Sequence, residues 1–166
     1  MVEKKIVVDQ LRLSYNGVFD INDFYNAVED WIQEKGMEKE TKKKLEHVMP
    51  HGKKLEWYIE CWKSVASYAK TIVRMRALFD EVKEVQIVKN KSKRRLNQGK
   101  VLIILDGILE TDIEGSWQQK PLFYFMRALV DKYIWKFHTN KYEAPLIDEV
   151  YDMHKTLKKF FARYNY

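Results

Sequence analysis

The sequence predicts an α+β fold in which an antiparallel sheet carries long amphipathic helices. Between Lys53 and Ile113, apolar residues alternate with polar ones at a period of two, which is typical of strands. Past Gly115 the period changes to about 3.6 residues, which is typical of helices. The predicted order is one strand, one helix, about five to six further strands or strand segments, and long C-terminal helices packed on the sheet.

Length and composition indicate a single folded domain over residues 1–166. A hydrophobic content of 46% is enough for a substantial core and argues against disorder. Cys61 is the only cysteine, so the chain forms no internal disulfide and no thiolate metal cluster. The sequence has no apolar run of about 18 residues and no apolar core of a signal peptide near its start. We therefore expect a cytoplasmic protein.

The first segment, Lys5–Tyr15, has the alternation of a strand, but Asp9 is out of place in it. A β-bulge near Asp9 and Gln10 explains the interruption, because one extra residue restores the alternation. Asn16–Gly17 then predicts a turn, since these two residue types favour positive φ.

A helix is expected to follow, with Asp20 as its N-cap and Gly36 as its C-terminal cap. A carboxylate at the N-cap accepts hydrogen bonds from the first free backbone N–H groups. The apolar residues between the caps fall on one face, which predicts the side that packs on the sheet. They are Ile21, Phe24, Val28, Trp31 and Ile32.

The middle of the chain contains the predicted antiparallel strands and their connections. Met37–Gly52 is weakly patterned and is interpreted as a short edge strand, with a helical turn as the alternative. The last strand is apolar on both faces around Gly107, which is typical of a strand inside a sheet. In order, the predicted parts are a strand from Leu55, a break at Ser64–Ser67, a strand over Thr71–Phe79, a tight connection at Asp80–Glu81, a strand over Val82–Val88, a hairpin end at Lys89–Gly99 and a strand over Val101–Ile113.

Two helices are predicted after the sheet. Pro121 suits the first turn of the first one, which carries a broad apolar stripe to Phe137. Thr139–Pro145 breaks the pattern. From Leu146 to Tyr164 apolar residues again recur at steps of three and four, which predicts the second helix.

This order of elements resembles the helix-grip fold of START-like and Bet v 1-like proteins, the SRPBCC superfamily. The resemblance covers nearly the whole chain and lies in topology, since no residue motif of the superfamily is present. It implies a curved sheet wrapped around the last helix, with a cavity for an apolar small molecule between them. The candidate ligand-binding residues are Trp57, Ile59, Val73, Met75, Asp106 and His154.

Asp106 is the carboxylate of most interest, because it lies in the most apolar stretch of the chain and is expected to face what the helices enclose. It shares strand parity with Glu110 and Asp112, although a solvated strand edge is the favoured interpretation of that set. No nucleophile elbow, Walker motif or dinucleotide motif occurs. These absences favour a binding protein over an enzyme, with no cofactor called for.

The histidines and the cysteine favour structural roles. His47 and His51 have the i, i+4 spacing of a helical metal pair, but Pro50 argues against a helix there and no third ligand is evident. We therefore predict no metal site. His154 lies beside an apolar stripe, and Cys61 shares the inward face with Trp57, which predicts a core thiol.

A basic run is the most specific feature outside the core. The net charge is +6, and six cations fall between residues 89 and 100. Two interpretations stay open: a solvated hairpin tip, which is favoured, and a surface that binds an anionic partner such as nucleic acid or an acidic protein. The candidate anion-binding residues are Lys89, Lys91, Lys93, Arg94 and Arg95. Aromatic residues on the last helix leave an oligomer contact open as well.

Overall fold

The computed structural model describes residues 2–112 and 135–164. Five strands and two helices are formed in these ranges, and the segment predicted as the first C-terminal helix lies largely outside them. In chain order the elements are β1 (Glu3–Phe19), α1 (Ile21–Glu34), β2 (Glu38–Met49), β3 (Gly52–Ala66), β4 (Ala69–Lys89), β5 (Ser92–Thr111) and α4 (Trp135–Ala162).

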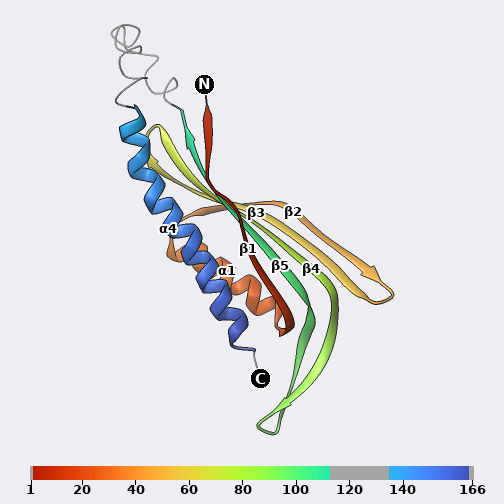
Figure 1. The fold of residues 1–166 in the computed structure, drawn as a ribbon. Coiled ribbons are helices and arrows are strands. Elements are labelled where there is room, and N and C mark those ends of the chain that lie inside the picture. Colours follow the sequence, from red (N-terminus) through yellow and green to blue (C-terminus); the bar gives the residue numbers. More distant parts are fainter. Residues whose placement is uncertain (1, 113–134, 165–166) are drawn as a thin grey trace, which may run out of the picture.

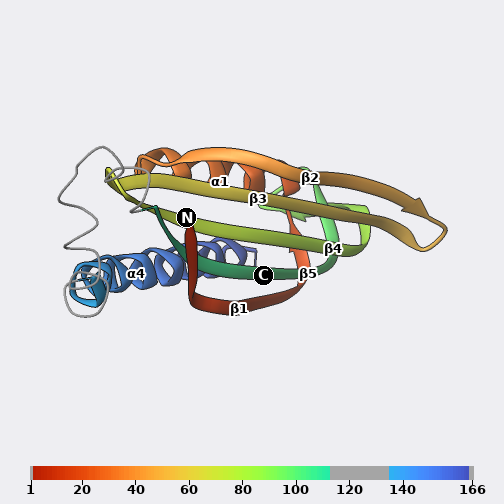
Figure 2. The same ribbon diagram turned by 90° about the horizontal axis from the view of Figure 1, so that it is seen from above.

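The five strands form one antiparallel sheet in the order β1-β5-β4-β3-β2. The first strand therefore pairs with the last, and β5 lies inside the sheet as its two apolar faces predict. Because β1 and β2 lie at opposite edges, α1 carries the chain from one edge to the other (Figure 2). The sheet twists strongly, and the β2–β3 and β4–β5 hairpins point in different directions (Figure 1).

Helix α1 has the predicted ends. The carboxylate of Asp20 accepts hydrogen bonds from the backbone N–H groups of Asn22 and Asp23 at 2.9 and 3.3 Å. At the other end Gly36 has a φ of +65°, which most side chains disfavour, and the backbone N–H of Met37 donates to the carbonyl of Ile32. The caps satisfy backbone groups that the helix leaves free at its ends.

Both helices lie on the same face of the sheet, which we call the covered face. Its core is rich in aromatic rings, and Phe24 of α1 is fully buried among them. The ring of Phe24 lies 5.4 Å from that of Phe79 on β4 and 5.8 Å from that of Phe161 on α4. Burial of rings from three elements at one point holds both helices against the sheet.

Helix α4 passes close to the sheet at Gly107. A Cβ atom at this position would lie 2.9 Å from Cγ2 of Val150 and 3.5 Å from Cγ of Leu146. The absence of a side chain in the middle of β5 therefore allows the helix to pass close to the strand.

Three sequence predictions about connections are wrong. The expected turn at Asn16–Gly17 is part of β1, where Gly17 is nearly extended and pairs with Gly99. The expected connection at Asp80–Glu81 is a bulge within a continuous β4, with Glu81 at a φ of +53°. A positive φ can bend a strand as well as reverse it, so residue type alone does not distinguish a bulge from a turn.

The third correction is the break expected at Thr139–Pro145, where α4 is a continuous helix. Proline lacks the N–H that would donate to the carbonyl four residues earlier, that of Lys141. Both Pro145 and Lys141 are exposed, so water can satisfy that carbonyl. Burial of Leu146, Val150 and Met153 against the sheet then keeps the helix together on its other side.

Other predictions are confirmed. The bulge near Asp9 and Gln10 is present, since the β1 register shifts between Val8 and Leu11. Met37–Gly52 contains the edge strand β2, which is exposed along its whole length. Its lysines are typical of a free sheet edge, where charge discourages pairing with another chain.

Candidate ligand-binding trough

The face of the sheet opposite the helices is covered by no helix among the described residues, and we call it the uncovered face. Its side chains have an ordered arrangement. Strand pairing aligns them in rows that cross the sheet. One row consists of Ser14, Leu102, Leu78 and Glu56, from β1, β5, β4 and β3. The row above it consists of Arg12, Ile104, Arg76 and Tyr58.

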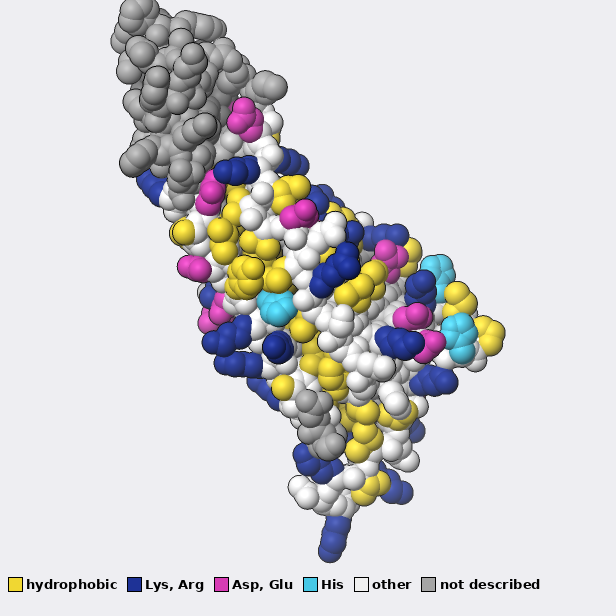
Figure 3. Space-filling model, in the orientation of Figure 1, with side chains coloured by type: hydrophobic (Ala, Val, Ile, Leu, Met, Phe, Trp, Pro, Cys, Tyr) yellow, Lys and Arg dark blue, Asp and Glu magenta, His cyan; other side chains and the backbone are white. Residues whose placement is uncertain are grey.

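A trough of about 830 Å³ lies over the lower of these rows. Leu78 and Leu102 form its apolar floor, and both are partly exposed. Ser14 and Asn16 line it from β1, while Lys54 and Glu56 line it from β3. In Figure 3 the surface between the two hairpin ends is mostly white, the colour of backbone and uncharged polar side chains, with hydrophobic patches. A volume in this range matches that of small-molecule sites in proteins.

The trough exists because the sheet twists and bends. Asp80 and Lys100 are register partners at its lower end, and the next pairing on the two strands is Lys83 with Gln98. The extra residues on β4 form the Glu81 bulge, which turns the β4–β5 hairpin away from β3. Since β2 and β3 continue straight on, the uncovered face becomes concave between the two hairpins.

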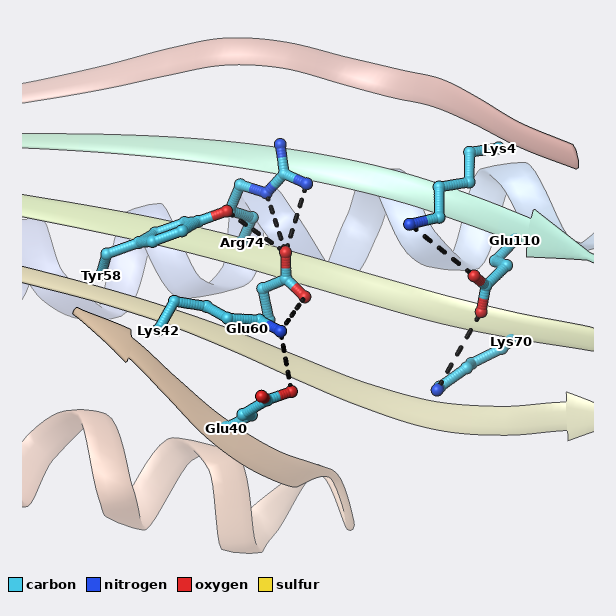
Figure 4. A network of polar contacts seen from close by, with 8 residues as sticks. All are labelled: Lys4, Glu40, Lys42, Tyr58, Glu60, Lys70, Arg74 and Glu110. Atoms are coloured by element: carbon cyan, nitrogen blue, oxygen red, sulfur yellow. Dashed lines mark hydrogen bonds and ion pairs between the residues drawn. The ribbon is translucent and has the colours of Figure 1, made fainter. Parts of the chain in front are cut away.

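Above the trough the same face carries a network of ion pairs, shown in Figure 4. Oε1 of Glu60 accepts from Nε of Arg74 at 3.3 Å and lies 3.2 Å from its Nη2. The hydroxyl of Tyr58 also donates to this oxygen, at 3.2 Å. Burial is the main cause that raises the pKa of Tyr58 above its usual value, so the hydroxyl stays a donor at neutral pH.

Asp106 belongs to this uncovered face, and the expectation that it faces the helices is wrong. Its neighbour Gly107 contacts α4, and successive residues of a strand point to opposite faces. Oδ1 of Asp106 accepts a hydrogen bond of 2.7 Å from the backbone N–H of Gln10, in the β1 bulge. The buried carboxylate therefore holds the bulge by bonding an N–H group at the interruption of the ladder.

The other four strand residues proposed as ligand contacts lie together on the covered face, as their alternation predicts. Ile59, Val73 and Met75 have no exposed surface, and Trp57 retains 4%. They face the helices and belong to one continuous core with Phe24 and Phe79. In the described residues these side chains contact protein rather than line the trough.

His154 of α4 lies away from that group. Its Nε2 is 3.1 Å from the carbonyl oxygen of Arg12, so the ring can bond the free edge of β1 when Nε2 carries the proton. Lys5 and Glu143 form a second bridge between β1 and α4. The two contacts fix the helix along the edge strand.

The basic run lies at the β4–β5 hairpin, whose turn is shorter than the predicted Lys89–Gly99. Only Asn90 and Lys91 form it, both with positive φ, and Ser92 already begins β5. This pair of angles defines a type I′ turn, for which asparagine is favoured. Within the run Arg94 has a structural role: its Nη2 lies 3.0 Å from Oδ2 of Asp23. The hydroxyl of Tyr164 donates to the same oxygen at 3.1 Å, so the hairpin, α1 and α4 meet at one carboxylate.

Cys61 is fully buried, and burial raises the pKa of its thiol to about 12, which leaves it protonated and unreactive at neutral pH.

His47 lies on β2 and His51 in the β2–β3 turn, both exposed. Among the described residues, no group of three potential metal-ligating side chains of His, Cys, Asp and Glu type comes together. Within the same residues, no helix is long and apolar enough to cross a membrane.

No protein-family model, curated protein or solved structure matches this chain.

The trough was not predicted from the sequence, although the sequence contains a signal for it. Leu78 and Leu102 are register partners on the parity of β4 and β5 that also carries Arg76, Asp80 and Lys100, so two apolar residues meet there among charged ones. The bend that makes the face concave depends on reading Asp80–Glu81 as a bulge.

Proposed function

We propose that the protein binds a small molecule with an apolar body, and that its binding site is the trough on the uncovered face. The observation that supports this proposal is the floor of Leu78 and Leu102 inside a concave surface of about 830 Å³. An apolar ring or chain laid on this floor would remove apolar surface from water on both partners. Ser14 and Asn16 can orient it by hydrogen bonds.

The trough replaces the cavity between sheet and last helix as the proposed location of the ligand. The helix-grip resemblance itself stays a proposal, supported by a curved sheet with a long C-terminal helix along one face. The candidate contacts on the covered face, among them Met75, already pack against protein. A ligand there would have to displace core side chains.

Fluorescence titration with the uncharged dye N-phenylnaphthylamine tests binding. Leu78→Glu and Leu102→Glu place a charge on the trough floor and should weaken binding about tenfold or more. Ile6→Glu is the matched control, because Ile6 is 58% exposed on the edge strand and does not line the trough. Equal affinity of all three variants would contradict the proposal.

Methyl NMR distinguishes the two locations. With leucine and methionine methyl groups labelled, the dye should shift the signals of Leu78 and Leu102. Shifts confined to Met75 and Met153, which lie fully buried on the covered side, would place the ligand between sheet and helices and overturn the trough as its site.

A second proposal, binding of an anionic partner at the basic hairpin, is favoured by one observation. Lys91, Lys93 and Arg95 are exposed, and in the described part of the chain no ion pair engages them. Reversing these three charges should lower the salt concentration that elutes the protein from heparin, because fewer anion contacts form. Unchanged elution would exclude this surface. Arg94 is left intact, since it pairs with Asp23.

A further inference from the structure

We propose that the trough selects ligands with an anionic group at one end, and that Arg12 and Arg76 bind that group. This inference rests on the proposed function, because it specifies the ligand of the same site. The two arginines stand one row above Ser14, Leu102 and Leu78 on the same face, with Ile104 between them. Two strand spacings separate them, which is about 10 Å between their Cα atoms.

Arg76 lacks the partners that a guanidinium usually has. Its Nε is buried without a hydrogen-bond partner. The carboxylate paired with it, Oδ2 of Asp106, lies 3.9 Å from Nη2, beyond hydrogen-bond distance. The other oxygen of Asp106 is occupied by the backbone N–H of Gln10. The Arg76 side chain is 42% exposed, so its guanidinium retains charge and Nη donors for a ligand, although Nε itself is buried.

Arg12 is in a similar position on the edge strand β1, two strands away from Arg76. Its Nη2 donates to a neutral group, the side-chain oxygen of Gln10, at 3.2 Å. Arg74, one row further from the trough, is different, because Glu60 and Tyr58 surround it. Of these three arginines on the uncovered face, the two beside the trough are therefore the ones without a carboxylate within hydrogen-bond distance.

The opposite end of the trough has no such excess of positive charge. Lys54 and Lys100 line this end, but Lys100 pairs with Glu81 at 3.4 Å, and Asp80, the register partner of Lys100, adds a second negative charge. On the β3 side, Glu56 pairs with Lys43 at 3.2 Å. The charges therefore favour one orientation, with the anionic group between Arg12 and Arg76 and the apolar body over Leu78 and Leu102.

These features define a ligand class: an amphiphile with a carboxylate, sulfonate or phosphate group. From the row of Arg76 to that of Asp80 is four residues along β4, or about 13 Å. A fused-ring acid or a short acyl chain has this length. Arginine suits such a group, because its planar fork of donors matches the oxygens of an oxyanion.

Two dyes that share a ring system distinguish binding of an anionic group by the arginines from binding of an apolar body in the trough. Anilinonaphthalene sulfonate carries an anion that N-phenylnaphthylamine lacks. The double variant Arg12→Gln and Arg76→Gln should weaken binding of the sulfonate about tenfold or more and change binding of the neutral dye less than twofold. Arg74→Gln is the matched control and should change neither by more than twofold.

The outcomes test the role of the arginines separately from the role of the trough as a binding site. Equal loss for both dyes in the double variant, or no loss for the sulfonate, overturns the role of the arginines and leaves the Leu78 and Leu102 tests to judge the trough itself. The double variant Arg12→Lys and Arg76→Lys keeps the charges and should retain most of the preference for the sulfonate. Thermal unfolding and circular dichroism of the glutamine variant establish that its loss of binding is not a loss of fold.

Discussion

The two faces of the sheet are built from the same strands but differ in what their side chains contact. On the covered face, side chains from the sheet and from both helices are apolar and aromatic, and nearly all are buried. On the uncovered face, ion pairs cover a few buried isoleucines in one part, and an open trough lies in the other. The contrast teaches that packing constrains one face tightly, while the other has room for a binding surface.

The largest expected effect is on the free energy of unfolding, and it comes from substituting adjacent isoleucines on β5. Ile103 is fully buried on the covered face, and Ile104 is 8% exposed on the uncovered face. Ile103→Ala should cost about 3 to 5 kcal/mol of the free energy of unfolding, because helices enclose the cavity it leaves. Ile104→Ala should cost about 2 kcal/mol or less, since the long side chains of Arg12 and Arg76 can close over it. Urea unfolding measures both, and equal costs would remove the distinction between the faces.

The second effect tests the close approach of α4 to the sheet. Gly107→Ala should destabilise the protein by about 1 to 3 kcal/mol, because the new methyl group meets Val150. Val150→Ala opens that space, so the double variant should lose less stability than the two single variants together. Strict additivity in thermal or urea unfolding would show that helix and strand are not in tight contact there.

The third effect concerns the carboxylate where three elements meet. Burial, followed by the hydrogen bond to Asp23, raises the pKa of Tyr164 to about 12. A raised pKa means that the neutral phenol stabilises the fold fully below pH 10, about where the unfolded residue titrates, and that this contribution is lost as pH rises towards 12. Tyr164→Phe should cost about 1 kcal/mol at pH 7, and the difference from wild type should shrink above pH 10. A difference independent of pH in that window would argue against the hydrogen bond.

The smallest effect is expected in the ion-pair network of the uncovered face. Glu60→Gln weakens the contacts with Arg74 and Lys42 and should cost about 1 kcal/mol or less, since the pairs are partly solvated. The cost should decrease further in high salt, because ions screen the charges of the wild-type protein. A cost above that of Ile104→Ala would mean that polar pairing, rather than apolar burial, holds this face.

Much of the fold could be predicted from the sequence, because alternation and periodicity report directly which residues are buried. The ends of α1, the bulge of β1 and the interior position of β5 follow from such local signals. Two of the errors fall where one residue type is compatible with two structures. Asn16–Gly17 and Asp80–Glu81 could each be turn or strand, and only pairing with neighbouring strands decides between them.

The candidate site was harder to predict, because it depends on which strands are neighbours. Arg12 and Arg76 are far apart in the sequence, and they share a row only because β1 pairs with β5 and β5 with β4. Asp106 illustrates the same limit. Its apolar surroundings in the sequence indicated burial, but not that the partner would be a backbone N–H of the β1 bulge on the uncovered face.

The pairing of β1 with β5 also has a consequence for how the chain folds. The hairpins β2–β3, β3–β4 and β4–β5 join consecutive segments, whereas β1 must find a partner from the far end of the sheet-forming sequence. Closing so long a loop is entropically costly, so we expect β1 to dock after the hairpins have formed. The carboxylate of Asp106 then sets the register of that late step through the N–H of Gln10. In pulse-labelled hydrogen exchange the amides of β1 should become protected after those of β3 to β5, and simultaneous protection would contradict this order.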